Sequence, residues 1–108
     1  MPFFPEGIIL IKSSLEKKTG CLTISVIGRF DYTCHKAFKE AFGGVTATCY
    51  EVDLSETLYL DSSALGMLLL LRDNAGGEKA TVRLLSPNRT VMEVLNMANF
   101  GLLFNIVE

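Results

Sequence analysis

The sequence predicts an α/β protein with a mixed, mostly parallel β-sheet of about five strands and three or so helices packed against it, in the order β-β-α-β-α-β-α-β. Short alternating or apolar segments recur between segments of helical periodicity. Strands separated by single helices favour right-handed crossovers and parallel pairing, and only the first two strands, joined by a short turn, are expected to be antiparallel. The 108 residues, 49% of them hydrophobic, suffice for one core. Residues 1–108 are therefore expected to form a single domain.

Five segments are predicted to be strands. The clearest is Cys21 to Gly28, where Leu22, Ile24 and Val26 lie on one face of an alternating pattern. At the start of the chain, residues 1–6 are expected to form a loose N-terminal arm. In chain order, the predicted strands are Ile8 to Lys12, Cys21 to Gly28, Thr48 to Leu54, Ala80 to Leu85 and Leu102 to Val107.

Three helices are predicted from capping residues and apolar stripes. The first follows Asp31, whose carboxylate can accept hydrogen bonds from the free N–H groups of a helix start. The second runs from about Ser62 to Asn74. The third begins at Ser86-Pro87, with the serine as its cap, and ends at Asn99, which tolerates a left-handed conformation. The expected buried stripe of the first helix is Cys34, Phe38, Ala41 and Phe42.

Composition argues against several classes of protein. The formal charge is −2 and no basic stripe is present, so nucleic-acid binding is not expected. The longest apolar run, Ala64 to Leu71, is far shorter than the ~20 residues of a membrane-spanning helix. The first five residues lack the basic region of a signal peptide. We therefore expect a cytoplasmic protein without membrane insertion.

The cysteines carry no metal or disulfide signature. Cys21, Cys34 and Cys49 are odd in number and have no C-x-x-C spacing, which argues against a disulfide framework and against a zinc site. The sequence therefore predicts reduced cysteines in the core. No metal ion and no cofactor are expected.

The second predicted helix has two distinct faces. At roughly 100° per residue, Ala64, Leu65, Leu68 and Leu71 cluster as the core face, whereas Ser62 and Gly66 lie opposite. Leu69 and Leu70 lie near the polar side. Either neighbouring elements cover these two leucines or they belong to a docking patch for a protein partner. Gly66 would let the backbone of such a partner approach closely.

Ser62 occupies a position suited to phosphorylation. A helix N-terminus favours anions through its free N–H groups and its dipole, and a phosphate there would carry roughly −1.5 to −2 charges. Asp61 precedes it and Asp31 is expected nearby, so the modification would alter surface charge more than the fold. The simpler alternative is that Asp61 or Ser62 only caps the helix.

Three segments together resemble STAS domains of the anti-sigma factor antagonist type. Asp61-Ser62-Ser63-Ala64-Leu65-Gly66 after an apolar strand is similar to the signature of that family. Gly28-Arg29-Phe30-Asp31 resembles its glycine-to-aspartate turn. Ser86-Pro87 and the residues up to Leu103-Phe104-Asn105-Ile106 resemble its usual ending. The resemblance covers most of the chain.

The resemblance implies a binding module that is not an enzyme. In such proteins the unmodified form captures an anti-sigma factor, usually a serine kinase of the GHKL type, and a PP2C-type phosphatase reverses the phosphorylation. By position the phosphorylated residue would be Ser62, with Ser63 as the alternate, and Asp31 and Asp61 would flank it. The partner surface would include Ser62, Ser63, Gly66, Leu69 and Leu70. ATP would be the kinase's substrate.

Two departures from the family pattern matter. Ala64 stands where the family usually has glycine. Many relatives also carry a further C-terminal helix, whereas this sequence ends at Glu108, just after the last predicted strand. Without that helix, part of the sheet could be exposed, which raises the prospect of a homodimer or a different partner surface.

The resemblance leaves other partners open, and the residues raise one alternative of another class. The chain could be a STAS regulator of another partner, in a two-component, biofilm or motility pathway, or a STAS subunit of a lipid-transport ABC complex. A serine hydrolase built from Ser62, His35 and Asp31 is the alternative of another class. The sequence lacks the G-x-S-x-G motif of such enzymes, and the three side chains would also have to lie within hydrogen-bond reach.

Overall fold

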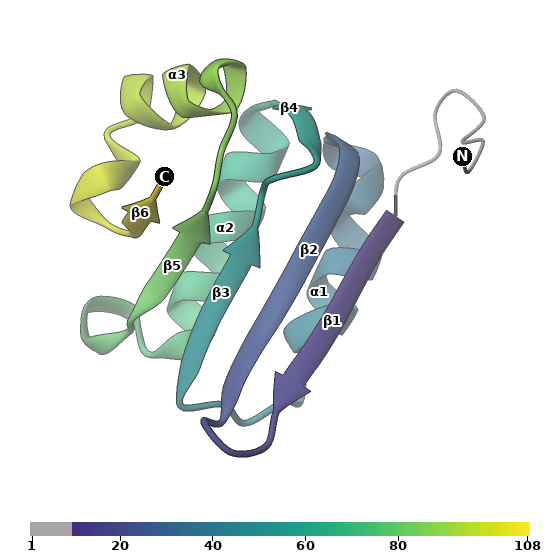
Figure 1. Ribbon diagram of the computed structural model, residues 1–108, viewed down its shortest axis with the longest axis vertical. Helices are drawn as coiled ribbons and strands as arrows, with labels where there is room; N and C mark the ends of the chain where they lie inside the picture. Colours follow the sequence, from purple (N-terminus) through teal and green to yellow (C-terminus); the bar gives the residue numbers. More distant parts are fainter. Residues whose placement is uncertain (1–9) are drawn as a thin grey trace.

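The computed structural model describes residues 10–108 and contains a six-stranded sheet with three α-helices (Figure 1). The predicted arm at residues 1–6 lies outside the described part, as do the first two residues of the first predicted strand. The strands are β1 (Leu10–Glu16), β2 (Cys21–Phe30), β3 (Cys49–Asp53), β4 (Thr57–Leu60), β5 (Val82–Leu85) and β6 (Asn105–Val107). The α-helices are α1 (His35–Phe42), α2 (Ser62–Ala75) and α3 (Arg89–Met97), and the 3₁₀ helices are η1 (Tyr32–Cys34), η2 (Gly77–Lys79) and η3 (Phe100–Leu102).

The sheet is mixed and mostly parallel, which confirms the predicted fold class. Its strand order is β1-β2-β3-β5-β6, and β4 pairs separately with β2. Among the strands of residues 10–108, only the β1–β2 pair is antiparallel, as expected for strands joined by a short turn. Helices α1 and α2 lie behind the sheet in Figure 1, whereas α3 lies at the end where β4 is found and contacts that strand.

The core lies between the sheet and the helices α1 and α2. In β2, Leu22, Ile24 and Val26 are buried, as the alternating pattern predicts. The parallel register places Leu22 beside Tyr50 and Ile24 beside Val52 of β3, so each buried row continues across the sheet. Against these rows pack the buried aromatic and aliphatic side chains of the two helices, which are Phe38, Phe42, Ala64, Met67, Leu68 and Leu71.

The sequence-based prediction misses one strand. β3 ends at Asp53, whose side chain accepts a hydrogen bond from the Ser55 N–H (3.0 Å), and the chain turns before it continues as β4. Thr57 fixes that turn because its buried Oγ1 donates to the Val26 carbonyl of β2 at 2.6 Å. The chain therefore forms a second strand beyond the predicted one, and both β3 and β4 pair with β2 in parallel, β3 with its first half and β4 with its end.

The start of α3 also differs from the prediction. Asn88, and not Ser86, caps the helix, because the Asn88 Oδ1 accepts from the Val91 N–H at 2.8 Å. Ser86 instead has a positive φ of 53°, and its N–H donates to the Val107 carbonyl of β6. At the other end, Asn99 has a φ of 58°, which confirms the left-handed position after the helix.

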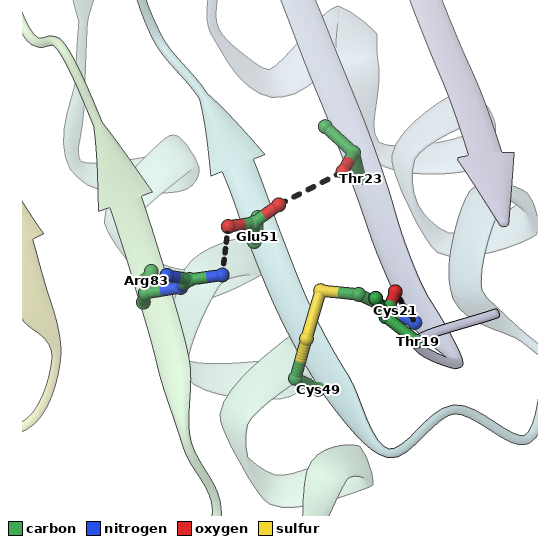
Figure 2. A network of polar contacts seen from close by, with 6 residues as sticks. All are labelled: Thr19, Cys21, Thr23, Cys49, Glu51 and Arg83. Atoms are coloured by element: carbon green, nitrogen blue, oxygen red, sulfur yellow. Dashed lines mark hydrogen bonds and ion pairs between the residues drawn. A yellow bond between two sulfur atoms is a disulfide. The ribbon is translucent and has the colours of Figure 1, made fainter. Parts of the chain in front are cut away.

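The prediction of reduced cysteines is wrong for two of the three. Cys21 and Cys49 form a disulfide (Figure 2), whereas Cys34 is free and buried as expected. The two bonded residues are direct partners in the β2–β3 register, with 4.5 Å between their Cα atoms. The sequence spacing cannot reveal this, because the residues lie 28 positions apart and only the strand pairing brings them together.

The different roles of Asn88 and Ser86 give a test of this helix start. We expect Asn88→Ala to lower the free energy of unfolding by about 1–2 kcal/mol, because a cap hydrogen bond is lost. The substitution also removes the 2.9 Å hydrogen bond from the Asn88 side chain to the Thr57 carbonyl. Ser86→Ala should change stability by less than about 0.5 kcal/mol. Urea unfolding of both variants checks this, and a larger loss in Ser86→Ala than in Asn88→Ala would contradict the capping assignment.

Candidate functional site

The paired ends of β2 and β4 bring Asp31 and Asp61 to the same edge of the molecule. Phe30 and Leu60 are register partners in this parallel pair, and each aspartate follows directly after one of them. The Asp61 N–H donates to the Phe30 carbonyl at 3.2 Å, which ties the two segments together. Because parallel strands end at a common edge, the helices that follow also begin side by side.

Asp61 is the N-cap of α2. Its backbone is extended (φ −113°, ψ −173°), and its Oδ1 accepts a hydrogen bond from the Ala64 N–H at 3.0 Å. Ser62 is therefore the first helical residue rather than the cap. The side chains of Ser62 and Ser63 are exposed. The capping function and the candidate phosphorylation site thus fall on two neighbouring residues.

Asp31 is likewise the N-cap of η1, the 3₁₀ helix that leads into α1. Its Oδ1 accepts hydrogen bonds from both the backbone N–H and the hydroxyl of Thr33. The Thr33 hydroxyl bond lowers the pKa of Asp31 most, and this effect, together with the Thr33 N–H and the charge of Arg29, outweighs the opposing effect of burial. Asp31 is therefore ionised at neutral pH and adds negative charge to this edge.

Both aspartates lie close enough to the buried thiol of Cys34 to affect its pKa. Burial is the main cause that raises the pKa of Cys34, and the negative charges of Asp31 and Asp61 raise it further. Its Sγ donates to the Arg29 carbonyl at 3.3 Å. A protonated thiol therefore lies beneath the two carboxylates and contributes no charge of its own to the site.

The outer face of α2 is open. Gly66 is exposed, and a Cβ added there would meet no atom within 4 Å. Leu69 and Leu70 are 37% and 45% exposed, so neighbouring elements cover them only in part. The core face is rotated slightly from the predicted one, since Met67 is buried and Leu65 is only partly buried. The tertiary packing around α2, which includes contacts with α1, therefore shifts the buried stripe from the one that helical periodicity predicts.

Three exposed apolar residues near this edge were missed by the sequence analysis. Tyr32 directly follows Asp31 and is 72% exposed, and Leu58 and Tyr59 of β4 are 64% and 39% exposed. The burial pattern of β4 has two exposed residues between two buried ones, so no simple alternation marks it. The adjacency of Tyr32 to a capping aspartate was the only sequence signal available for it.

The structure does not assemble the alternative hydrolase triad. The Asp31 carboxylate accepts its hydrogen bonds from Thr33, and within the described residues no hydrogen bond joins His35 to Asp31 or to Ser62. In that same part of the chain, no group of three or more His, Cys, Asp or Glu residues could hold a metal ion. None of its helices combines the length and the apolar character needed to cross a bilayer.

Comparisons with known proteins agree with this geometry. The family model described as "Mlab, STAS domain" matches residues 13–107. A STAS-domain containing protein from Pseudomonas aeruginosa (strain UCBPP-PA14) is 51% identical over 87 residues, which cover 79% of this chain and 86% of that protein.

Two solved structures share the fold at low sequence identity. An anti-sigma factor antagonist from Mycobacterium paratuberculosis has a TM-score of 0.80 and 18% identity, covering 97% of this chain and 90% of its own. SpoIIAA, an anti-sigma factor antagonist in its unphosphorylated form, has a TM-score of 0.75 and 16% identity, covering 92% of this chain and 89% of its own. The fold thus matches these antagonists, and the family model together with the Pseudomonas relative shows that this chain belongs to the STAS domain family.

Proposed function

We propose that this protein is an anti-sigma factor antagonist whose binding is switched by phosphorylation of Ser62. The observation that carries the proposal is the placement of this serine, which is exposed at the first position of α2 and follows a capping aspartate. The fold shared with two anti-sigma factor antagonists supports the same class. In this proposal the chain is a cytoplasmic binding module that catalyses no reaction.

The capping bond explains why a phosphate on Ser62 would act on the surface charge. The Asp61 carboxylate already accepts the Ala64 N–H, so a neighbouring phosphate would have fewer backbone donors to neutralise it. Asp31 and Asp61 add negative charge beside it, and the phosphate brings roughly −1.5 to −2 more. A partner that docks against the neutral serine would then have to cover a strongly anionic edge, and the cost of desolvating those charges would oppose association.

The partner surface in this proposal follows the open side of α2. It comprises Ser62, Ser63, Gly66, Leu69 and Leu70, with Asp31 and Asp61 shaping the environment of the phosphate. Exposed apolar side chains beside a modifiable serine provide contact area that a charge change can control. The partner would be an anti-sigma factor with serine kinase activity of the GHKL type, and a PP2C-type phosphatase would restore the free hydroxyl.

A second candidate function is a STAS subunit that docks without a phosphorylation switch, such as one in a lipid-transport ABC complex or in another regulatory pathway. The matching family model carries the description "Mlab, STAS domain", which names no sigma-factor pathway. Such a subunit would use the open face of α2 continuously. Its binding would therefore be insensitive to charge at position 62, which separates it from the first candidate.

One prediction of the proposed switch concerns the residue that is phosphorylated. We expect incubation with ATP and the GHKL-type anti-sigma factor kinases of the same genome to add one phosphate, on Ser62, because this hydroxyl is exposed. Intact-mass and peptide mass spectrometry would locate it. Ser62→Ala should abolish the addition, whereas the matched variant Ser63→Ala should retain it. Phosphate on the Ser62→Ala protein would refute the assignment of this residue.

The charge dependence of binding is a separate prediction. Ser62→Asp should weaken association with the anti-sigma factor at least about tenfold, since covering an unpaired carboxylate at an interface can cost more than about 1.4 kcal/mol. Ser62→Ala should bind about as well as the wild type. Isothermal titration calorimetry measures both. Equal affinity of the Ser62→Asp variant and the wild type would favour the unswitched docking subunit.

A substitution at Gly66 should affect stability and binding in opposite directions, so the two effects can be measured separately. Gly66→Ala should raise the free energy of unfolding by roughly 0.5–1 kcal/mol, because alanine is the better helix former and the added methyl group meets no atom within 4 Å. If the backbone of a partner approaches this glycine, the same methyl group should weaken binding. Urea unfolding and calorimetry give the two values. Unchanged affinity in a stabilised variant would place Gly66 outside the interface.

A further inference from the structure

We propose that Cys21 and Cys49 form a reversible redox site, a dithiol–disulfide pair that small thiols and disulfides interconvert in the folded protein. The site lies where β2 and β3 begin (Figure 1), whereas β4, which leads into α2, pairs with the other end of β2. The inference is independent of the phosphorylation switch and holds for either candidate function.

Strand register places the two sulfur atoms within bonding reach. Cys21 and Cys49 are direct partners in the parallel β2–β3 ladder, and their Cα atoms are 4.5 Å apart. This distance lies within the usual range for disulfides. The bond therefore forms between residues that the backbone hydrogen bonds already align.

Other contacts hold this end of the sheet without the disulfide. The Thr48 Oγ1 donates to the Thr19 carbonyl at 2.7 Å, and the Thr48 N–H donates to the Gly20 carbonyl at 2.8 Å. The Thr19 hydroxyl in turn accepts the Cys21 N–H at 3.2 Å. These bonds tie the β1–β2 turn to the start of β3, so reduced thiols would stay side by side.

A second set of contacts holds β2 and β3 together two residues further along and adds β5. Glu51 of β3 accepts a hydrogen bond from the Thr23 hydroxyl of β2 at 3.1 Å and forms an ion pair with Arg83 of β5 (Figure 2). This carboxylate therefore links β2, β3 and β5 on the face that carries the disulfide. Reduction would remove one cross-link from a region that keeps several others, so unfolding is not required.

The pair is more accessible to reagents than the third cysteine. Within the described residues no helix covers the face of the sheet that carries the disulfide, since α1 and α2 lie on the other side (Figure 1). Cys49 is partly exposed and Cys21 is 6% exposed. Cys34 is 1% exposed in the core, where oxidants and thiols do not reach it. An incoming thiol would therefore meet Cys49 first.

The chemistry is thiol–disulfide exchange in two steps. In reduction, a thiolate attacks the Cys49 sulfur, the Cys21–Cys49 bond breaks, and Cys21 leaves as the thiolate. The thiolate of a second small thiol then attacks the sulfur that the first small thiol contributed to the mixed disulfide, and Cys49 leaves as the thiolate. Two electrons and two protons pass from two small thiols, which become one small disulfide, to the protein. Oxidation by a small disulfide such as oxidised glutathione runs the same steps in reverse.

The main effect of oxidation would be on stability. The bond closes a loop with a sequence separation of 28 residues, which contains most of β2, Asp31 and all of α1. Such a closure restricts the unfolded chain. Reducing compartments oppose disulfides of this kind, so the bond would form there only under oxidising conditions and would stabilise the fold when it does.

The experiment titrates the full-length protein with glutathione buffers of increasing oxidised fraction. Maleimide labelling of the native protein, read by peptide mass spectrometry, follows each cysteine. We expect Cys21 and Cys49 to lose and regain labelling together, with Cys34 unlabelled throughout. The melting temperature should fall by roughly 10 °C or more on reduction. Circular dichroism should show that the reduced form stays folded.

Single substitutions of each cysteine provide the controls. Cys34→Ala should retain the difference in melting temperature between the two redox states, whereas Cys21→Ser and Cys49→Ser should each abolish it. Hydrogen exchange on reduction should increase at the start of β2 and β3 but not at the start of α2. The proposal is wrong if the native pair cannot be reduced without unfolding, if it does not re-form in oxidised glutathione, or if reduction leaves the melting temperature unchanged.

Discussion

The pairing of β4 with the end of β2 is the constraint on which the candidate site depends. It aligns Phe30 with Leu60 and lets the Asp61 N–H donate to the Phe30 carbonyl. Without this pairing, the two aspartates would cap two unrelated helices. The buried hydroxyl of Thr57 secures the pairing by donating to the Val26 carbonyl, since a buried carbonyl without a partner would cost free energy. One short strand of four residues thus sets the position of Ser62.

Most of the fold followed from local patterns in the sequence, and the misses have physical reasons. The alternation of Leu22, Ile24 and Val26 predicted β2, and the pairing directions followed from the lengths of the connections. β4 was missed because its division from β3 depends on a tertiary hydrogen bond made by Thr57. The disulfide was missed because residues 28 positions apart meet only after the strands pair.

More of the candidate site could be predicted from the sequence than the missed strand and the missed disulfide suggest. The residue types alone predicted that Asp61 or Ser62 caps a helix, and helical periodicity placed Leu69 and Leu70 near its polar side without deciding whether neighbours cover them. The burial of Met67 in place of Leu65 does need them, because it depends on which elements pack around α2. Sequence patterns therefore located the serine and its helix, whereas packing decided which apolar side chains remain in contact with solvent.

The length of β2 has a consequence for how many chemical signals this small protein can carry. The strand has ten residues, and at about 3.3 Å per residue its ends lie roughly 30 Å apart. That separation exceeds the Debye length of about 8 Å at physiological salt, so a charge added at one end is screened at the other. The proposed phosphorylation of Ser62 and the proposed redox change of the cysteine pair would therefore be independent, and together they would give the chain four covalent forms.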